Sequence, residues 1–210
     1  MGSIMGSIEL VVARHNEDVS WLRRVPHPAV VYDKGRDSGE PGAVRLPNVG
    51  REGHTYAHHI VARFEDLADF TWFLQGRIDD HDRKALDTIV ETSCPNGFVA
   101  LGAHGPWGSR GLKVVDLDCG KHPNLRPVTH RVFRRLFGEA AEVPPPYAFM
   151  PGALFGASKA AIRARGLDFW RRLVATLEHD VDPIEGYAVE RLWPLIFSPS
   201  ILLAEEPPRE

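Results

Sequence analysis

The chain has 210 residues and a formal net charge of −3 at pH 7; 43% of its residues are hydrophobic and 25% are charged. This length and composition predict one globular domain with one core. No run approaches the roughly 18 apolar residues of a membrane span, and the slightly acidic balance gives no global field that attracts nucleic acid. We therefore expect a small-molecule substrate, no nucleic-acid partner and no membrane span, and the oligomeric state stays open.

The two cysteines, Cys94 and Cys119, lack CxxC spacing and indicate neither a zinc knuckle nor a disulfide framework. A reducing, cytoplasmic location suits such a sequence. The repeated MGSI at the start predicts a disordered segment or cloning remnant over residues 1–7. We expect a single α/β domain of catalytic type over residues 8–198 and a flexible tail over residues 199–210.

Apolar runs alternate with turn signals along the whole chain. In the first half we predict, in order, a strand at Ile8–Arg14, a helix that starts at Asn16, a strand at Ala29–Gly35, a long loop at Arg36–Gly53, a helix at His54–Phe64 and a strand at Asp69–Gly76. In the second half we predict strands over residues 97–103, 111–118 and 153–159, and helices over residues 81–92, 127–139, 160–180 and 183–197.

This alternation favours an α/β fold, in which a mostly parallel sheet is flanked by helices, because parallel neighbours need crossover connections. We predict that Glu9–Arg14, Ala29–Asp33 and Thr71–Gln75 are neighbouring strands of one central sheet. Ligands of open α/β sheets bind at the carboxyl ends of the strands. The segments that follow these strands are therefore the candidate sites.

The first candidate is ARHNED, residues 13–18, which leaves the first strand with a run of polar side chains. We predict that it contacts a substrate through Arg14, Asn16, Glu17 and Asp18. The alternative is that Asn16 caps the following helix and the acids complement its dipole. A cap does not require Arg14, so both interpretations stay open.

The second candidate is LPNVGREGHTYAHHI, in which Arg51 stands between two glycines at a helix start. Backbone N–H groups and an arginine in that position can hold a phosphate or a carboxylate. His54 and His58 are four residues apart and share a helix face, a spacing that can chelate a metal, although packing and hydrogen bonding are the commoner roles. His59 points elsewhere. We expect His54 to contact substrate and His58 to act in catalysis.

The third candidate is FLQGRIDDHD, residues 73–82, in which a strand ends in a cluster of acids. Carboxylate oxygens suit hard cations such as Mn²⁺ or Mg²⁺, so we predict a divalent-metal site formed by Asp79, Asp80 and His81. Gln75 is an unusual end for a buried strand unless something polar approaches, and we expect it to bind substrate. The alternative is a turn whose acids cap a helix that begins near His81.

Several strings in this order, among them GREGHTY, FLQG and ERLW, are specific, and over roughly Glu9 to Phe197 the chain resembles domain-of-unknown-function family 3431. That family is similar to GT-A glycosyltransferases, α/β enzymes that bind a nucleotide-sugar and usually a divalent metal through Asp-x-Asp at a strand end. The resemblance implies that Glu185 or Glu190, in EGYAVERLW, supplies a catalytic base and that Arg191 lies beside the substrate. A charge pair at a helix edge is the alternative for Glu190 and Arg191. FLQGRIDDH departs from the pattern, because it holds no Asp-x-Asp.

Three functions remain at this point. The first is a GT-A-like transferase that moves a sugar or a similar activated group from a nucleotide donor with the help of a metal. The second keeps the fold but is a metal- or acid/base-dependent tailoring enzyme in a biosynthetic pathway, with His54, His58, Asp79 and His81 around a small substrate and no sugar donor. The third is a binding protein without catalysis, in which polar clefts would be expected to disappear first.

Overall fold

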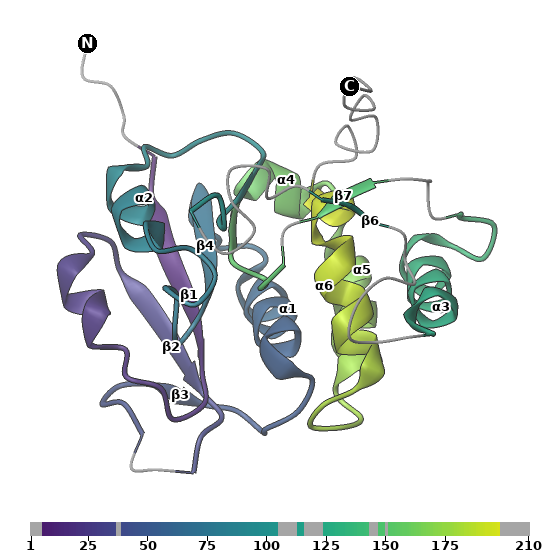
Figure 1. Cartoon of the computed structure of the whole chain (residues 1–210), viewed down its shortest axis with the longest axis horizontal. Coiled ribbons are helices and arrows are strands. Elements are labelled where there is room, and N and C mark those ends of the chain that lie inside the picture. Colours follow the sequence, from purple (N-terminus) through teal and green to yellow (C-terminus); the bar gives the residue numbers. More distant parts are fainter. Residues whose placement is uncertain are drawn as a thin grey trace.

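A computed structural model describes residues 6–36, 39–104, 113–115, 124–142, 147–149 and 151–197. Its central feature is a six-stranded sheet with the order β3-β2-β1-β4-β8-β5 (Figure 1). The strands are β1 (Ile8–Arg14), β2 (Ala29–Asp33), β3 (Val44–Arg45), β4 (Phe70–Gln75), β5 (Phe98–Ala100) and β8 (Phe155–Ser158). A second, two-stranded sheet pairs β6 (Lys113–Val115) with β7 (Tyr147–Phe149) in antiparallel fashion.

The four strands β3, β2, β1 and β4 are parallel, whereas β8 runs antiparallel between β4 and β5. The prediction that Glu9–Arg14, Ala29–Asp33 and Thr71–Gln75 are neighbouring strands of one sheet is therefore confirmed: β1 pairs in parallel with both β2 and β4. Strand β1 is buried along almost its whole length, as its continuous run of apolar residues indicates for a strand covered on both faces. Gly156 on β8 lies against Phe70 and Trp72, and a Cβ there would come within 2.3 Å of the Phe70 ring.

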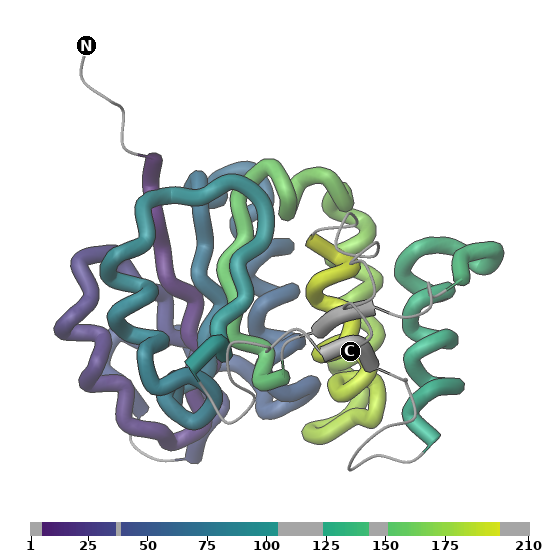
Figure 2. Tube along the Cα trace, turned by 45° about the horizontal axis from the view of Figure 1, so that its top comes forward, coloured from purple at the N-terminus to yellow at the C-terminus, as the bar shows by residue number. Residues whose placement is uncertain are grey.

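Helices cover both faces of the sheet, as the tube in Figure 2 also shows. They are α1 (Arg51–Arg63), α2 (Ala85–Glu91), α3 (Leu125–Phe137), α4 (Lys159–Arg163), α5 (Leu167–Leu177) and α6 (Ile184–Phe197), with a 3-10 helix η1 (Ser20–Arg24). Val11 and Phe73 face the larger core under α1, α5 and α6, whereas Leu10 and Trp72 face a smaller core with α2 and η1. This alternation follows from the two-residue period of a strand. No helix among the described residues is long and apolar enough to cross a membrane.

Several boundaries differ from the sequence-based expectation. The helix expected from Asn16 is the short η1, which begins at Ser20, and α1 begins three residues earlier than expected. The long loop contains the two-residue strand β3, and the helix expected over residues 160–180 breaks at Gly166 (φ 69°) into α4 and α5. Strand β7 follows a proline run and was not expected. The predicted tail at residues 199–210 and Cys119 lie outside the described residues.

Candidate functional site

The sheet order reverses direction at β1: β2 and β3 follow on one side, and β4 lies on the other. A crevice outside the carboxyl ends of strands at such a switch point is the usual ligand site of open α/β sheets. A cavity of about 400 Å³ lies there, with Arg14, His15, Lys34, Arg51, Glu52 and Gln75 among its walls. We call it the switch-point cavity. It brings together residues from all three candidate segments.

Arg14, at the end of β1, is a buried clamp between two strands. Its Nη1 donates to Asp33 Oδ2 at 2.8 Å, and its Nε donates to the carbonyl of Glu17 at 2.9 Å. Asp33 is fully buried and also accepts from Arg45 Nη1 at 2.8 Å. A buried carboxylate needs such partners, because an unpaired charge in the interior is costly. Arg14 therefore fixes the geometry of the cavity.

The segment after β1 folds over the ends of β2 and β4. Asn16 has a positive φ of 71°, and its Oδ1 accepts from the Arg36 N–H at 2.8 Å. Glu17 accepts from the His15 N–H and lies against Gly76, where a Cβ would come within 2.7 Å of Glu17 Oε2. The carboxylate of Asp18 accepts from the N–H and the hydroxyl of Ser20, both at 2.8 Å. The suggestion that Asn16 caps the helix is therefore wrong: the N-cap residue of η1 is Val19, which makes no side-chain cap hydrogen bond, and Asp18 binds Ser20 in the turn ahead of it.

Lys34, the residue after β2, is almost completely buried. Its Nζ donates to the carbonyls of Val49 and Arg51, each at 2.6 Å, and lies 3.5 Å from His54 Nδ1. Burial lowers the pKa of Lys34 to about 8. The ammonium group thus holds the start of α1 against the end of β2.

The chain enters α1 through an unusual backbone conformation, and the first turn of this helix lines the cavity. Gly50 (φ 63°) and Arg51 (φ 52°) are both left-handed, and a Cβ on Gly50 would come within 2.8 Å of the Leu177 carbonyl. The Arg51 guanidinium lies 4.2 Å from the centroid of the Tyr187 ring, and its Nη1 lies 3.2 Å from Asp182 Oδ1. Because its side chain is 30% exposed, it can contact a ligand without leaving these partners.

Glu52, in the first turn of α1, lines the switch-point cavity and has a side chain that is only 14% exposed. Its Oε2 lies 3.6 Å from Arg51 Nε. Burial raises the pKa of Glu52, and the charge of nearby Glu190 raises it further, against the opposing effect of Arg51. A carboxylate with a raised pKa is a stronger proton acceptor than an ordinary one.

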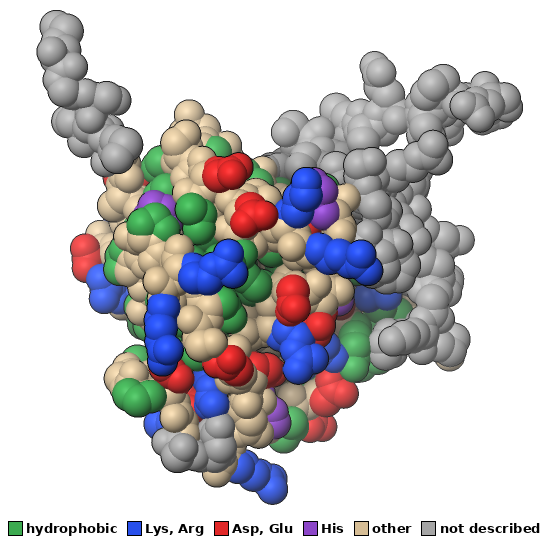
Figure 3. All heavy atoms as spheres, turned by 60° about the vertical axis from the view of Figure 1, so that its left-hand side comes forward, with side chains coloured by type: hydrophobic (Ala, Val, Ile, Leu, Met, Phe, Trp, Pro, Cys, Tyr) green, Lys and Arg blue, Asp and Glu red, His purple; other side chains and the backbone are tan. Residues whose placement is uncertain are grey.

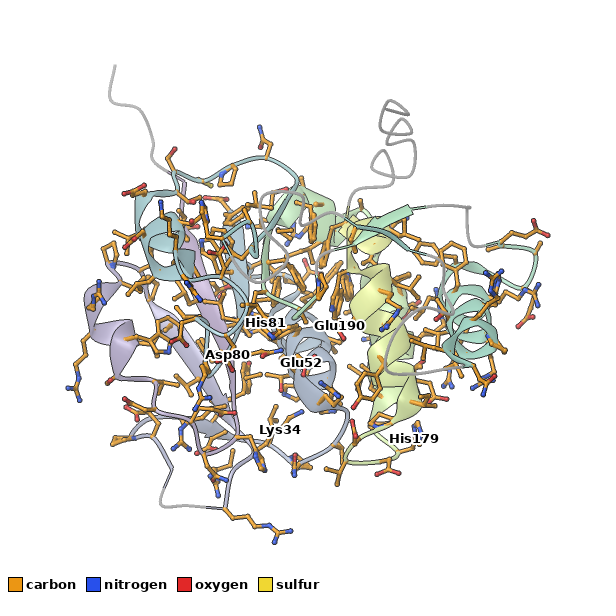
Figure 4. The ribbon with its side chains drawn as sticks, viewed as in Figure 1. Lys34, Glu52, Asp80, His81, His179 and Glu190 are labelled. Atoms are coloured by element: carbon orange, nitrogen blue, oxygen red, sulfur yellow. The ribbon has the colours of Figure 1, made fainter. Side chains whose placement is uncertain are left out.

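Gly152 connects three predicted site residues from distant parts of the chain. Gln75 Nε2 donates to the Gly152 carbonyl at 2.8 Å, and the Gly152 N–H donates to Glu190 Oε1 at 2.7 Å. A Cβ on Gly152 would lie 2.5 Å from the His81 ring, so the imidazole packs directly on this glycine. In the view of Figure 4 the labelled side chains of His81, Asp80 and Glu190 surround Glu52 of α1, and Lys34 lies below them.

The structure takes other predicted residues away from this group. Glu185 lies 3.3 Å from Arg131 Nη2 on α3 and 3.5 Å from His179 Nε2. Arg191 is buried and donates to the Tyr187 carbonyl at 2.9 Å. Glu185 therefore ties α6 to α3, Arg191 bonds within α6, and neither lines the switch-point cavity.

Of the three histidines of α1, His54 and His59 are buried and His58 is half-buried. His54 and His58 stack with their ring centroids 6.0 Å apart, and His58 also meets the edge of Tyr32 at 5.7 Å. Burial, together with the charge of Lys34, lowers the pKa of His54 to about 4, and burial lowers the pKa of His58. His59 bridges Tyr32 and Glu9 in the sheet.

The predicted metal ligands do not form a preassembled site. Asp79 lines a different cavity, Asp80 lies 3.7 Å from Arg77 Nη1, and His81 packs on Gly152. Within the described part of the chain, no group of three or more His, Cys, Asp or Glu side chains is placed to hold a metal ion. Asp79 and Asp80 do not cap the following helix either. The acid that binds ahead of α2 is Asp82, which accepts a hydrogen bond from the Lys84 N–H. Any cation here would depend on oxygens of a ligand.

The cavity residues that were not among the predicted site residues include two charged, largely buried ones, Lys34 and Glu52. The rule that ligands meet strand ends would have identified Lys34, because it follows β2 just as Gln75 ends β4. Glu52 stands in the same GREG string as Arg51, but its burial depends on tertiary packing and could not be read from spacing.

Comparisons with known proteins bear on the family alone. The family model described as protein of unknown function (DUF3431) matches residues 10–206. No curated protein and no solved structure matches the chain.

Proposed function

This chain belongs to the DUF3431 family, and we propose that it is a glycosyltransferase-like enzyme that transfers a sugar or a similar activated group from a nucleotide donor. The observation that carries the proposal is the switch-point cavity, which joins the carboxyl ends of β1, β2 and β4 to the first turn of α1. Its volume of about 400 Å³ lies within the range of small-ligand sites.

The side of the cavity at α1 suits the phosphates of the donor. The first N–H groups of a helix have no partner within the helix and carry partial positive charge. Arg51 stands at this turn, and the buried ammonium of Lys34 holds the carbonyl of that same residue. The strand order β3-β2-β1-β4 also occurs in nucleotide-binding α/β sheets, in which the phosphates lie at the start of the helix that follows the first strand; here α1, which follows β3, begins at that edge instead. These features support a GT-A-like relationship.

Glu52 is the residue in this cavity best suited to take a proton from the acceptor. In the proposed step the acceptor hydroxyl gives its proton to the Glu52 carboxylate, and its oxygen forms a bond to the reacting carbon of the donor. The bond from that carbon to the phosphate oxygen breaks, and the electron pair leaves with the nucleoside diphosphate. Glu190, which the sequence suggested as the base, holds the Gly152 N–H and positions Gln75 through the same glycine.

The test combines binding with turnover. Isothermal titration calorimetry with UDP, GDP and ADP should give binding by at least one nucleotide, and the matching nucleotide-sugar should lose its sugar to an acceptor or slowly to water. Glu52→Gln should keep nucleotide affinity within about threefold and lower turnover by about 10²- to 10⁴-fold. Glu185→Gln, on the far side of α6, is the matched control. If no nucleotide binds the wild-type protein, the proposal fails.

A further inference from the structure

A second cavity, of about 510 Å³, lies on the other side of the β4 end, between η1, the turn after β4 and α2. We call it the outer cavity; its walls include Trp21, Arg24, Gly76, Asp79, Arg83 and Asp87. The contact between Glu17 and Gly76 separates it from the switch-point cavity. The two cavities therefore meet at β4, where Gln75 lines one and Gly76 lines the other.

Trp21 gives the outer cavity a fixed aromatic surface. Its Nε1 donates to the Gly76 carbonyl at 2.8 Å, and its ring also packs against the core that contains Trp72 and Leu74. A ring held at both its polar and its apolar side loses little further freedom when a ligand stacks on it. Flat apolar faces of the kind that sugar rings present are suited to such a surface.

Four of the charged side chains around this tryptophan are free to bind a ligand, whereas Asp18, Arg77 and Asp82 in the same walls are bonded within the protein. Within the described part of the chain, Arg24, Asp79, Arg83 and Asp87 make no hydrogen bond or ion pair, and two are positive and two negative. On the side of the molecule turned forward in Figure 3, acidic and basic side chains are likewise interspersed. Carboxylates accept from hydroxyl groups and guanidinium groups donate to them, so this rim fits a neutral, hydroxyl-rich molecule better than an ion.

We propose that the outer cavity binds a saccharide, with Trp21 as the stacking surface and the four charged side chains as hydroxyl partners. The further statement that this saccharide is the acceptor rests on the proposed function. A saccharide of two or more units held on Trp21 can extend across the Glu17–Gly76 contact, so that its terminal hydroxyl reaches the donor while its other units stay in the outer cavity.

The experiment uses the full chain and three probes: maltotriose, cellotriose and mannotriose. Saturation-transfer NMR and calorimetry should detect binding of at least one of them at millimolar concentration. Trp21→Ala should weaken that binding about tenfold or more. Because Trp21 also packs on the core, the surface double variant Arg83→Ala/Asp87→Ala is made in parallel and should weaken binding at least about threefold. Arg171→Ala, an exposed arginine on α5, is the matched control and should bind as the wild type does.

Failure to bind any of the three trisaccharides overturns the inference, and so does unchanged affinity in both sets of variants. Nucleotide affinity separates this inference from the proposed function, because the outer-cavity variants should bind UDP, GDP or ADP as the wild type does. Saccharide binding without nucleotide binding would leave the outer cavity as assigned and contradict only the transferase. Nucleotide binding without saccharide binding would leave the proposed function standing and contradict only the saccharide site in the outer cavity.

Discussion

The two cavities that meet at the end of β4 differ in how their charged side chains are held. In the switch-point cavity, Arg14 and Lys34 are buried and bound to protein oxygens. In the outer cavity, Arg24 and Arg83 are exposed and have no such partners among the described residues. The comparison indicates that the first cavity has a geometry set by folding, whereas the second can adjust its side chains to what it binds.

This difference has an energetic basis. A buried ion must be paired, so losing one partner costs stability, whereas an exposed pair contributes little. Mutations of the buried ions in the first cavity, Arg14 and Lys34, should therefore affect folding and binding together, and mutations of the exposed, unpaired charges in the second should affect binding alone. Four predictions test this comparison.

The largest effect is expected for Arg14→Ala, which removes one of the two arginine partners of buried Asp33. The free energy of unfolding should fall by about 3 to 5 kcal/mol, as for other broken buried pairs. Urea denaturation followed by circular dichroism measures it. The matched variant in the outer cavity, Arg24→Ala, should change stability by no more than about 0.5 kcal/mol. Equal losses in the two variants would contradict the distinction between the cavities.

A pH-dependent effect is expected at His54. Its pKa falls from 6.5 to about 4 in the folded protein, so the stability linked to its neutral form is complete above pH 6.5 and is lost as the pH falls through 4. Between pH 7 and pH 4.5 this amounts to roughly 2 to 3 kcal/mol. The stability of His54→Gln should therefore fall less steeply over this interval in urea denaturation, while His130→Gln, on α3, should follow the wild type. Parallel curves for wild type and His54→Gln would show that His54 is not buried in its neutral form.

Arg51→Ala should separate ligand binding from folding at the rim of the switch-point cavity. Charge-assisted contacts with an anion are worth about 1.5 to 3 kcal/mol, so nucleotide affinity should weaken roughly ten- to a hundredfold. The melting temperature should change little, because the side chain is 30% exposed. Arg131→Ala, an ion-paired arginine on α3, is the control for affinity. Unchanged affinity together with a large drop in melting temperature would mean that Arg51 is a structural residue.

The smallest effect concerns a divalent cation. With few protein ligands available, Mn²⁺ or Mg²⁺ should bind weakly to the free protein and more tightly when a nucleotide supplies further oxygens. Calorimetry with MnCl₂, with and without UDP, should show about a tenfold loss for His81→Ala in the presence of nucleotide, about 1.4 kcal/mol, whereas Asp79→Ala, in the wall of the outer cavity, should bind the cation as the wild type does. Metal binding at wild-type strength in His81→Ala would mean that His81 only packs on Gly152.

Much of the fold could be predicted from local pattern. The apolar runs at Ile8–Arg14 and Phe70–Gln75 are long enough to identify buried strands, and the connections between them are long enough to require parallel neighbours. Local pattern did not give the antiparallel direction of β8, because a four-residue apolar strand carries no record of its direction. Local pattern also predicted a helix from Asn16, where the chain forms only the short 3-10 helix η1 from Ser20.

The sequence by itself determined which segments end at the ligand-binding edge of the sheet, because strand ends can be read from where apolar runs stop. It therefore identified Arg14, Arg51 and Gln75 as residues of one region. Only the tertiary structure decided what each side chain does there. Arg14 is bound to buried Asp33. Asp79 lines the outer cavity and His81 packs on Gly152, although only one residue separates them in the chain. The physical reason is that the environment of a charge depends on which distant elements pack around it, as when Glu190 of α6 lies close enough to Glu52 to raise its pKa, and sequence spacing does not encode that packing.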